Sequence, residues 1–201
     1  MRIVYFATAA YAVRPLEELI RQGFSPVAVI TQPDKPRDRS LETQPPPIKP
    51  LAAAHKIRIL QPVSPDEIVN ELTALEPDLF VVIAYGCILS ARVLAIPRLY
   101  AINLHPSLLP RYRGAAPIHW ALAHQETMTG VTVIKLSPGI DDGPIIAQEP
   151  APIDPEDTAC TLHDRLSRQG ARLLVETVGR IEKGTVTFTP QNDGSATYAP
   201  K

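Results

Sequence analysis

The chain has 201 residues, a formal net charge of −1 and 45% hydrophobic residues, so it can form one sizeable core. The near-balanced charge excludes a nucleic-acid binder that depends on bulk positive charge, although a local basic patch passes this test. The chain has only two cysteines, Cys87 and Cys160, with no CxxC spacing, which excludes a disulfide scaffold and a cysteine-rich zinc site, and we expect a reduced, cytoplasmic protein.

The first half of the chain alternates short apolar runs with helical patterns. Strands are expected at 3–6, 27–30, 57–60, 79–84 and 100–104, and helices at 12–22, 51–56 and 66–75. The third helix has Ser64 as its expected N-cap and Pro65 at its first position. This alternation predicts an α/β, Rossmann-like fold, with a mostly parallel central sheet flanked by helices.

After residue 128 the pattern changes. Strands are expected at 130–136 and 145–148, joined by a loop rich in Gly, Asp and Pro. A long helix follows over 158–182, and then a polar tail. The longest apolar run, 79–84, is far shorter than the ~20 residues that a membrane helix needs, so no membrane segment is expected.

Two segments are predicted as loops. Residues 31–50 contain six prolines, so we expect no helix or strand to run through them. Their charges nearly cancel, which leaves two interpretations: a flexible surface loop or a weak phosphate-contacting arm. Residues 106–117 follow a strand, where open α/β sheets bind ligands.

Known nucleotide-binding patterns are missing from the chain. Residues 7–10, Ala-Thr-Ala-Ala, occupy the place where a dinucleotide-binding protein carries a glycine-rich turn. There is no GxxxxGK[ST] sequence either. A dinucleotide oxidoreductase and a P-loop nucleotidase are therefore both disfavoured.

Asn103 and His105 are the sharpest local feature. Positions i and i+2 of a strand project from the same face, so an amide and an imidazole would point together. Such a pair suits acyl chemistry, with Asn donating to an oxyanion and His moving a proton. Asp141 and Asp142 are candidates to orient the imidazole. Spacing alone leaves a satisfied polar pair as the alternative.

No metal site is expected. The histidines at 55, 119 and 124 have no second ligand at a metal-like spacing. Ser107 lies near His105, but no GxSxG elbow supports a serine nucleophile.

Longer strings then carry a resemblance. The segments TQPDKP (31–36), PDLFVVIAYGCIL (77–89), INLHPSLLPRYRGAAPI (102–118), TGVTV (129–133), GIDDG (139–143) and ATYAPK (196–201) occur in the order seen in one family. The chain resembles the 10-formyltetrahydrofolate-dependent formyltransferases over nearly its whole length. Within them it is most similar to the N-terminal catalytic domain of the methionyl-tRNA formyltransferases.

The resemblance implies a site. Asn103, His105 and Asp141 match the family's catalytic trio. The implied folate-binding residues are Tyr85, Gly86, Cys87, Ile88, Leu89, Ser107, Leu108, Leu109, Pro110, Gly139, Ile140, Asp142 and Gly143. The implied substrate-binding residues are Arg39, Arg111, Arg113 and Gly114. The formyl donor would be 10-formyltetrahydrofolate, used without a metal.

The resemblance also implies the acceptor of the formyl group. It would be an amine, in the first place the amino group of methionyl-tRNA, whose formylation serves translation initiation. Residues 1–189 would be the catalytic domain, and 190–201 the tail or the start of a linker to an absent C-terminal domain. Nucleotide-sugar N-formyltransferases, glycinamide ribonucleotide formyltransferase and a formyltetrahydrofolate hydrolase remain alternatives with the same chemistry. A folate- or RNA-binding module without activity is the alternative from another class.

The chain departs from the family pattern in places. Ala7-Thr8-Ala9 replaces the usual Gly-Thr-Pro after the first strand, and Ser90 stands where Pro is usual. The proline-rich loop also lacks the dense basic run of the relatives that grip tRNA. These departures leave the donor better supported than the acceptor.

Overall fold

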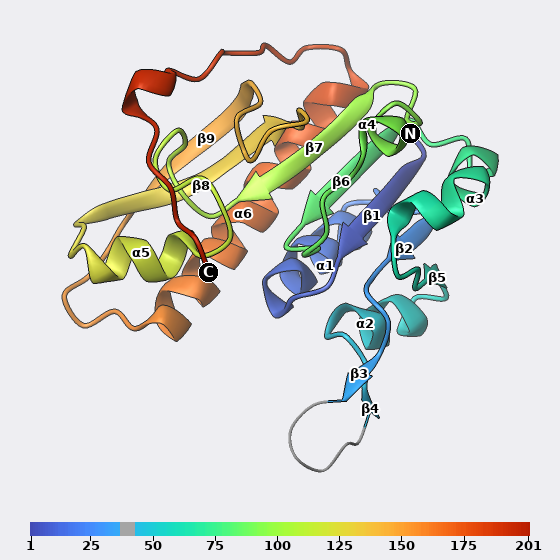
Figure 1. The fold of residues 1–201 in the computed structure, drawn as a ribbon, viewed down its shortest axis with the longest axis horizontal. Coiled ribbons are helices and arrows are strands. Elements are labelled where there is room, and N and C mark those ends of the chain that lie inside the picture. The colour runs from blue at the N-terminus through green and yellow to red at the C-terminus, as the bar shows by residue number, and fades with distance from the viewer. Residues whose placement is uncertain (37–42) are drawn as a thin grey trace. The chain divides into compact units, whose positions relative to one another are not determined.

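The computed structural model describes residues 1–36 and 43–201. They form two compact units, Met1–Ala101 and Ile102–Lys201, and Figure 1 shows the ribbon coloured along the chain. Each unit is described by itself below.

The first unit is built on four parallel strands. They are β1 (Ile3–Ala7), β2 (Ala28–Ile30), β5 (Arg58–Leu60) and β6 (Leu79–Ile83), in the spatial order β5-β2-β1-β6. Every residue of β1 and β6 is buried. Strands covered by helices on both faces lose the alternation of apolar and polar residues, which is why both read as continuous apolar runs. The four predicted strands and their parallel pairing are confirmed.

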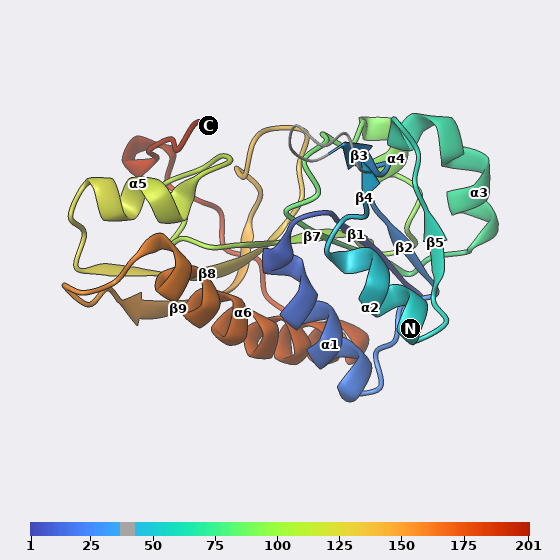
Figure 2. The ribbon, with the colours of Figure 1, turned by 90° about the horizontal axis from the view of Figure 1, so that it is seen from below.

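Helices cover both faces of these strands. They are α1 (Val13–Arg21), α2 (Ile48–Ala54), α3 (Val69–Ala74) and α4 (Ala91–Leu94). Figure 2 shows α1 and α2 below the strands, and α3 and α4 above them. The predicted cap at Ser64 is confirmed, because its hydroxyl accepts the N–H of Asp66 at 3.4 Å. The turn that it opens is a 3-10 turn, Pro65–Ile68, rather than the first turn of α3.

The proline-rich segment differs from its prediction. Lys35–Pro36 (β3) and Thr43–Gln44 (β4) pair antiparallel, and α2 begins inside the segment at Ile48. Pro50 is the third residue of α2, and the first turn of a helix makes no bonds with its own N–H groups, so proline is tolerated there. No described element runs through 31–50, but the segment is not the plain loop that was expected, because it contains this strand pair and the start of α2. Arg39 lies outside the described residues.

The second unit holds three antiparallel strands. They are β7 (Tyr100–His105, which begins in the last two residues of the first unit), β8 (Met128–Lys135) and β9 (Ile145–Pro152). The expected strands and the turn between β8 and β9 are confirmed. The strands of the first unit are therefore paired in parallel, and those of the second unit are paired antiparallel.

Two helices accompany these strands. The predicted long helix is α6 (Ala159–Glu182), which packs against β8 and β9 (Figure 2). The hydroxyl of Thr158 caps it by accepting the N–H of Thr161 at 3.2 Å. A short helix, α5 (Pro117–Ala123), follows the loop after β7. Its seven residues, like the four of α4, are too few for a periodic signal, and neither was expected.

No described helix combines the length and the apolar character that crossing a membrane requires.

Candidate active site

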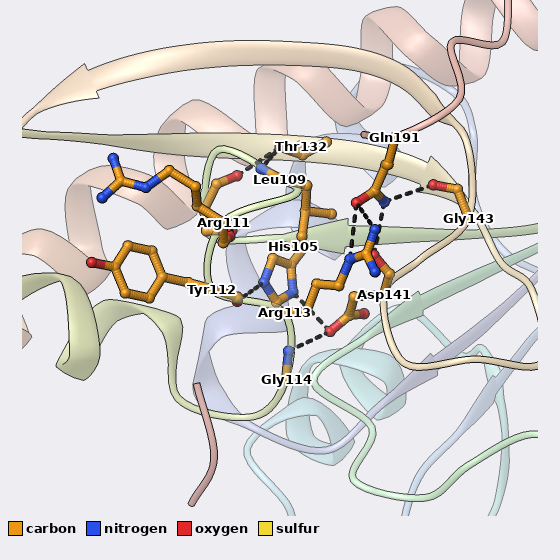
Figure 3. A network of polar contacts seen from close by, with 11 residues as sticks. His105, Leu109, Arg111, Tyr112, Arg113, Gly114, Thr132, Asp141, Gly143 and Gln191 are labelled. Atoms are coloured by element: carbon orange, nitrogen blue, oxygen red, sulfur yellow. Dashed lines mark hydrogen bonds and ion pairs between the residues drawn. The ribbon is translucent and has the colours of Figure 1, made fainter. Parts of the chain in front are cut away.

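His105 stands at the carboxyl end of β7, with only 4% of its surface exposed. Its Nε2 lies 2.9 Å from the carbonyl oxygen of Tyr112, and its Nδ1 lies 3.4 Å from Oδ2 of Asp141. Figure 3 shows the imidazole with these two groups on opposite sides. A carbonyl oxygen only accepts, so Nε2 carries a proton and donates it to Tyr112. A second proton, on the Nδ1 side, can then be shared with Asp141.

Asp141 is held in an uncommon backbone conformation. Its φ is +50°, in the left-handed region, which costs an L-residue about 1–2 kcal/mol. Two bonds secure it: Oδ2 accepts the N–H of Gly114 at 2.9 Å, and the carbonyl oxygen accepts Nε2 of Gln191 at 2.8 Å. The carboxylate is thus aimed at His105 by its surroundings.

Asn103 lies two residues before His105 on β7 and therefore on the same face of the strand. It is half-buried. Within the described part of the chain, its buried Oδ1 has no hydrogen-bond partner. Because buried polar atoms are nearly always bonded, an amide oxygen left open beside the imidazole is a group available to a ligand.

The loop after β7 is held by a buried hydroxyl. Oγ1 of Thr132 donates to the carbonyl of Ser107 at 2.6 Å and accepts the N–H of Leu109 at 3.3 Å. Nε2 of Gln148 donates to that hydroxyl at 2.8 Å and to the carbonyl of Leu109 at 3.0 Å. Ser107 itself donates to the carbonyl of Arg111 at 2.7 Å. In this structure, Ser107 and Leu109 therefore shape the loop, and their folate contacts remain predictions.

The two arginines of this loop differ. Arg111 is exposed, forms an ion pair with Glu126 and lies over the ring of Tyr112. Arg113 is only 4% exposed, and its guanidinium donates to Oε1 of Gln191 and, at 2.8 Å, to Asp193. Burial lowers the pKa of Arg113, but hydrogen bonds to Asp193 and Tyr198 outweigh it, so its pKa stays above the ordinary value. The guanidinium of Arg113, predicted to bind substrate, is thus directed here to Gln191 and Asp193, and that of Arg111 to Glu126.

Tyr112 joins the site to a polar cluster. Its hydroxyl donates to Glu126 at 2.6 Å and lies 3.1 Å from Nδ1 of His124. The hydrogen bond from Tyr112 lowers the pKa of Glu126, while burial and then Glu126 raise the pKa of Tyr112. Tyr112 has a φ of +62°, and the cluster helps to fix the residue whose carbonyl orients His105.

The remaining predicted folate residues fall in both units. In the first, Gln32 Nε2 donates to the carbonyl of Tyr85 at 3.1 Å and lies 3.5 Å from Cys87 Sγ. Gly86 has a φ of +84°, and a Cβ there would lie 2.7 Å from Gln32. Ile88 in this loop is 79% exposed, whereas Leu89 is buried. The folate contacts of this loop remain predictions.

In the second unit, the turn 139–143 leads from β8 to β9. Ser137 donates to the carboxylate of Asp142, and Gln191 Nε2 donates to the carbonyl of Gly143 at 2.7 Å. Ile140 is 59% exposed. This turn thus presents one apolar side chain beside Asp141.

Some residues of the site were not found from the sequence. Thr132, Gln148 and Gln191 shape the loop and the turn. Thr132 lies in the string TGVTV that helped to carry the resemblance, but nothing assigned it a role, and Gln148 and Gln191 lie outside all of those strings. Among the described residues, no three His, Cys, Asp or Glu side chains gather where they could hold a metal ion.

Comparisons with known proteins accord with this arrangement. A family model described as Formyl transferase matches residues 1–178. The chain is 47% identical to a methionyl-tRNA formyltransferase of Synechococcus sp. (strain JA-3-3Ab), over all of this chain and 64% of that protein. The chain therefore spans a little under two thirds of the length of this relative.

Solved structures share the fold. Phosphoribosylglycinamide formyltransferase from Bacillus halodurans superposes with a TM-score of 0.77 and 25% identity, over 90% of this chain and 95% of that one. The N-formyltransferase from Helicobacter canadensis, solved with folinic acid and dTDP-3-aminofucose, gives a TM-score of 0.78 and 24% identity, over 100% of this chain and 71% of that one. The Rossmann-like fold class is confirmed by these neighbours. The chain belongs to the formyl transferase family.

Proposed function

We propose that the chain transfers a formyl group from 10-formyltetrahydrofolate to an amine, and that the amine is the amino group of methionyl-tRNA. The observation that carries this proposal is the contact of 3.4 Å between His105 Nδ1 and the carboxylate of Asp141, with Asn103 on the same face of β7. An amide, an imidazole and a carboxylate in this arrangement suit acyl transfer and serve no purpose in a simple binding module.

The reaction has two steps. The unprotonated amine attacks the formyl carbon on N10 of the folate, a C–N bond forms, and the carbonyl electron pair moves to oxygen. The amide of Asn103 donates to that oxyanion from Nδ2, while its open Oδ1 can accept an N–H of the amine. The Asp141–His105 pair receives the proton that the amine loses. The oxyanion electron pair then re-forms the carbonyl, the C–N10 bond breaks with its electron pair going to N10, N10 takes the proton held by the Asp141–His105 pair, and tetrahydrofolate leaves.

The contacts of His105 limit the part that it can play in this reaction. Its Nε2 donates to Tyr112, so only the Nδ1 side is left to act on the reacting groups. We therefore assign His105 chiefly to proton movement together with Asp141, and oxyanion stabilisation chiefly to Asn103.

The donor and the acceptor rest on different support. A folate donor is supported by membership of the formyl transferase family. The acceptor is supported by the identity of 47% to a methionyl-tRNA formyltransferase. A tRNA acceptor would place the reaction in the cytoplasm.

An acceptor panel tests the proposal. The chain is incubated with 10-formyltetrahydrofolate and, separately, methionyl-tRNA, an amino-sugar nucleotide, glycinamide ribonucleotide or water alone. We expect formylmethionyl-tRNA as the main product. Formylation of one of the other amines would reassign the acceptor, and free formate alone would indicate a hydrolase. No product with any acceptor would favour the binding module.

A further inference from the structure

The C-terminal tail, defined here as residues 189–200, is bonded along the loop 110–116. The N–H of Arg113 donates to the carbonyl of Thr197 at 2.8 Å, and the N–H of Ala199 donates to the carbonyl of Arg113 at 2.7 Å. Figure 1 shows the red end of the chain passing beside the loop that follows β7. The tail is thus part of the folded second unit in this structure.

One side chain of the tail reaches further. Nε2 of Gln191 donates to the carbonyl of Asp141 at 2.8 Å and to that of Gly143 at 2.7 Å. Its Oε1 accepts from the guanidinium of Arg113, from Nε at 3.1 Å and from Nη2 at 2.9 Å. Figure 3 shows this amide with the turn on one side and the arginine on the other. Every hydrogen bond of this amide is thus made to Asp141 or to groups next to it.

Gln191 joins the turn 139–143 to the loop around Arg113, and these two segments together place Asp141 against His105. The turn carries Asp141, whose backbone is left-handed at a φ of +50°. The loop around Arg113 supplies the N–H of Gly114 to the carboxylate of Asp141 and the carbonyl of Tyr112 to His105. A change at Gln191 therefore acts on both sides of the Asp141–His105 contact at once.

We propose that Gln191 is a positioning residue that sets the distance between Asp141 and His105. It touches neither substrate, and it acts through the backbone of Asp141 and the side chain of Arg113. The contact that it controls is 3.4 Å long, at the outer limit for a hydrogen bond, so a further displacement would break it. The kinetic part of this inference rests on the proposed function, whereas the structural part does not.

Two substitutions separate the functions of the amide. Gln191→Leu removes the donor and the acceptor together. Gln191→Glu keeps an acceptor for Arg113 but removes both donors to the turn, and so remains informative if the leucine variant folds poorly. Gln169→Leu is the matched control, because that amide bonds Glu149 and Pro150, away from the site.

Two measurements report the outcome. In steady-state kinetics, we expect both Gln191 variants to lower kcat by about 10- to 100-fold, as misplacement of a reacting group by about 1 Å does. The KM for folate should change less than about twofold, because the amide does not face the substrate in the proposal. The Gln169→Leu protein should match the wild type in both constants.

The second measurement needs no reaction. The ring ¹⁵N resonances of His105, assigned by their loss in His105→Gln, report which nitrogens are protonated. We expect both Gln191 variants to shift the Nδ1 resonance toward its position in Asp141→Asn, while Gln169→Leu leaves it unchanged. The Nε2 resonance should remain that of a protonated nitrogen.

The outcomes separate this inference from the proposed function. Wild-type kcat and wild-type His105 resonances in Gln191→Glu would overturn the positioning role, whatever the acceptor. If the wild-type chain formylates none of the acceptors, the proposed function fails, and the His105 resonances alone decide the positioning role. Stability lost without a change in kcat or resonances would make the tail a structural latch and would also overturn the proposal.

Discussion

The hydroxyl of Thr132 on β8 supports the loop that leads away from His105. Removing it by Thr132→Val keeps the shape of the side chain but leaves the carbonyl of Ser107 and the N–H of Leu109 without that partner. Because an unsatisfied buried polar group costs about 1–3 kcal/mol, we expect the free energy of unfolding to fall by that amount. Urea denaturation at neutral pH measures it.

Thr129 on the same strand is the matched control. It is buried as well, but its hydroxyl has no hydrogen-bond partner within the described residues. Thr129→Val should therefore leave the stability unchanged or raise it. An equal loss of stability in both variants would show that packing at β8, rather than the hydrogen bonds of Thr132, holds the loop.

At the scale of elements, the loop after β7 and the C-terminal tail approach closely at Gly114. This residue has a φ of +115°, and a Cβ there would lie 2.9 Å from the carbonyl oxygen of Ala199. Gly114→Ala should therefore introduce backbone strain and displace the tail. Both changes would shift residue 114 and weaken the hydrogen bond from its N–H to the carboxylate of Asp141. We expect both a loss of stability above about 1 kcal/mol and a lower kcat.

Gly23→Ala separates these two effects. Gly23 also has a positive φ, +85°, but a Cβ there meets nothing within 4 Å. It should lose stability through strain alone and keep the kcat of the wild type. Urea denaturation and steady-state rates on both variants make the comparison, and equal kcat values would mean that the contact between tail and loop has no bearing on the site.

Helices and strands that bury a continuous face could be predicted from the sequence. Short elements, and those whose position depends on contacts with distant parts of the chain, could not. β1 and β6 read as strands because each is buried throughout, and α6 because its buried positions recur at helical spacing over 24 residues. α2 was foreseen only at its end, because its first turn lies among prolines whose effect depends on helix position.

The site divides in the same way. Asn103 and His105 were found because strand alternation and the local motif place them together. The sequence offered both Asp141 and Asp142 as candidates to orient the imidazole, and only the resemblance selected Asp141, since two separate stretches of chain meet there. Gln191 bonds a residue 50 positions away, and a glutamine near a chain end carries no pattern that would reveal this. Contacts of this kind are made by tertiary packing and need a structure.

At the scale of the whole molecule, acid stability depends on carboxylates such as Asp78. The pKa of Asp78 lies below its ordinary value because the backbone N–H of Arg2 and the guanidinium of Arg98 donate to it. The unfolded carboxylate therefore takes up a proton at a higher pH than the folded one. The stability from this group is present above about pH 4, the ordinary pKa, and is lost as the pH falls through the folded value.

Asp78→Asn tests this pH dependence. The variant should be less stable than the wild type at pH 7, and the difference should shrink at pH 3, as urea midpoints at the two values would show. Glu156→Gln, at an exposed position, is the control and should lie close to the wild type at both values. A difference that stays constant between pH 7 and pH 3 would contradict the assigned role of Asp78.

The account as a whole depends on His105 and its partners acting on the formyl group. The most direct test is single-turnover transfer of labelled formyl from 10-formyltetrahydrofolate to methionyl-tRNA, by the wild type and by His105→Ala, with folate binding measured separately. We predict transfer by the wild type, a rate lower by roughly 10²- to 10³-fold in the variant, and equal folate affinity. Equal rates in the two proteins would contradict the account.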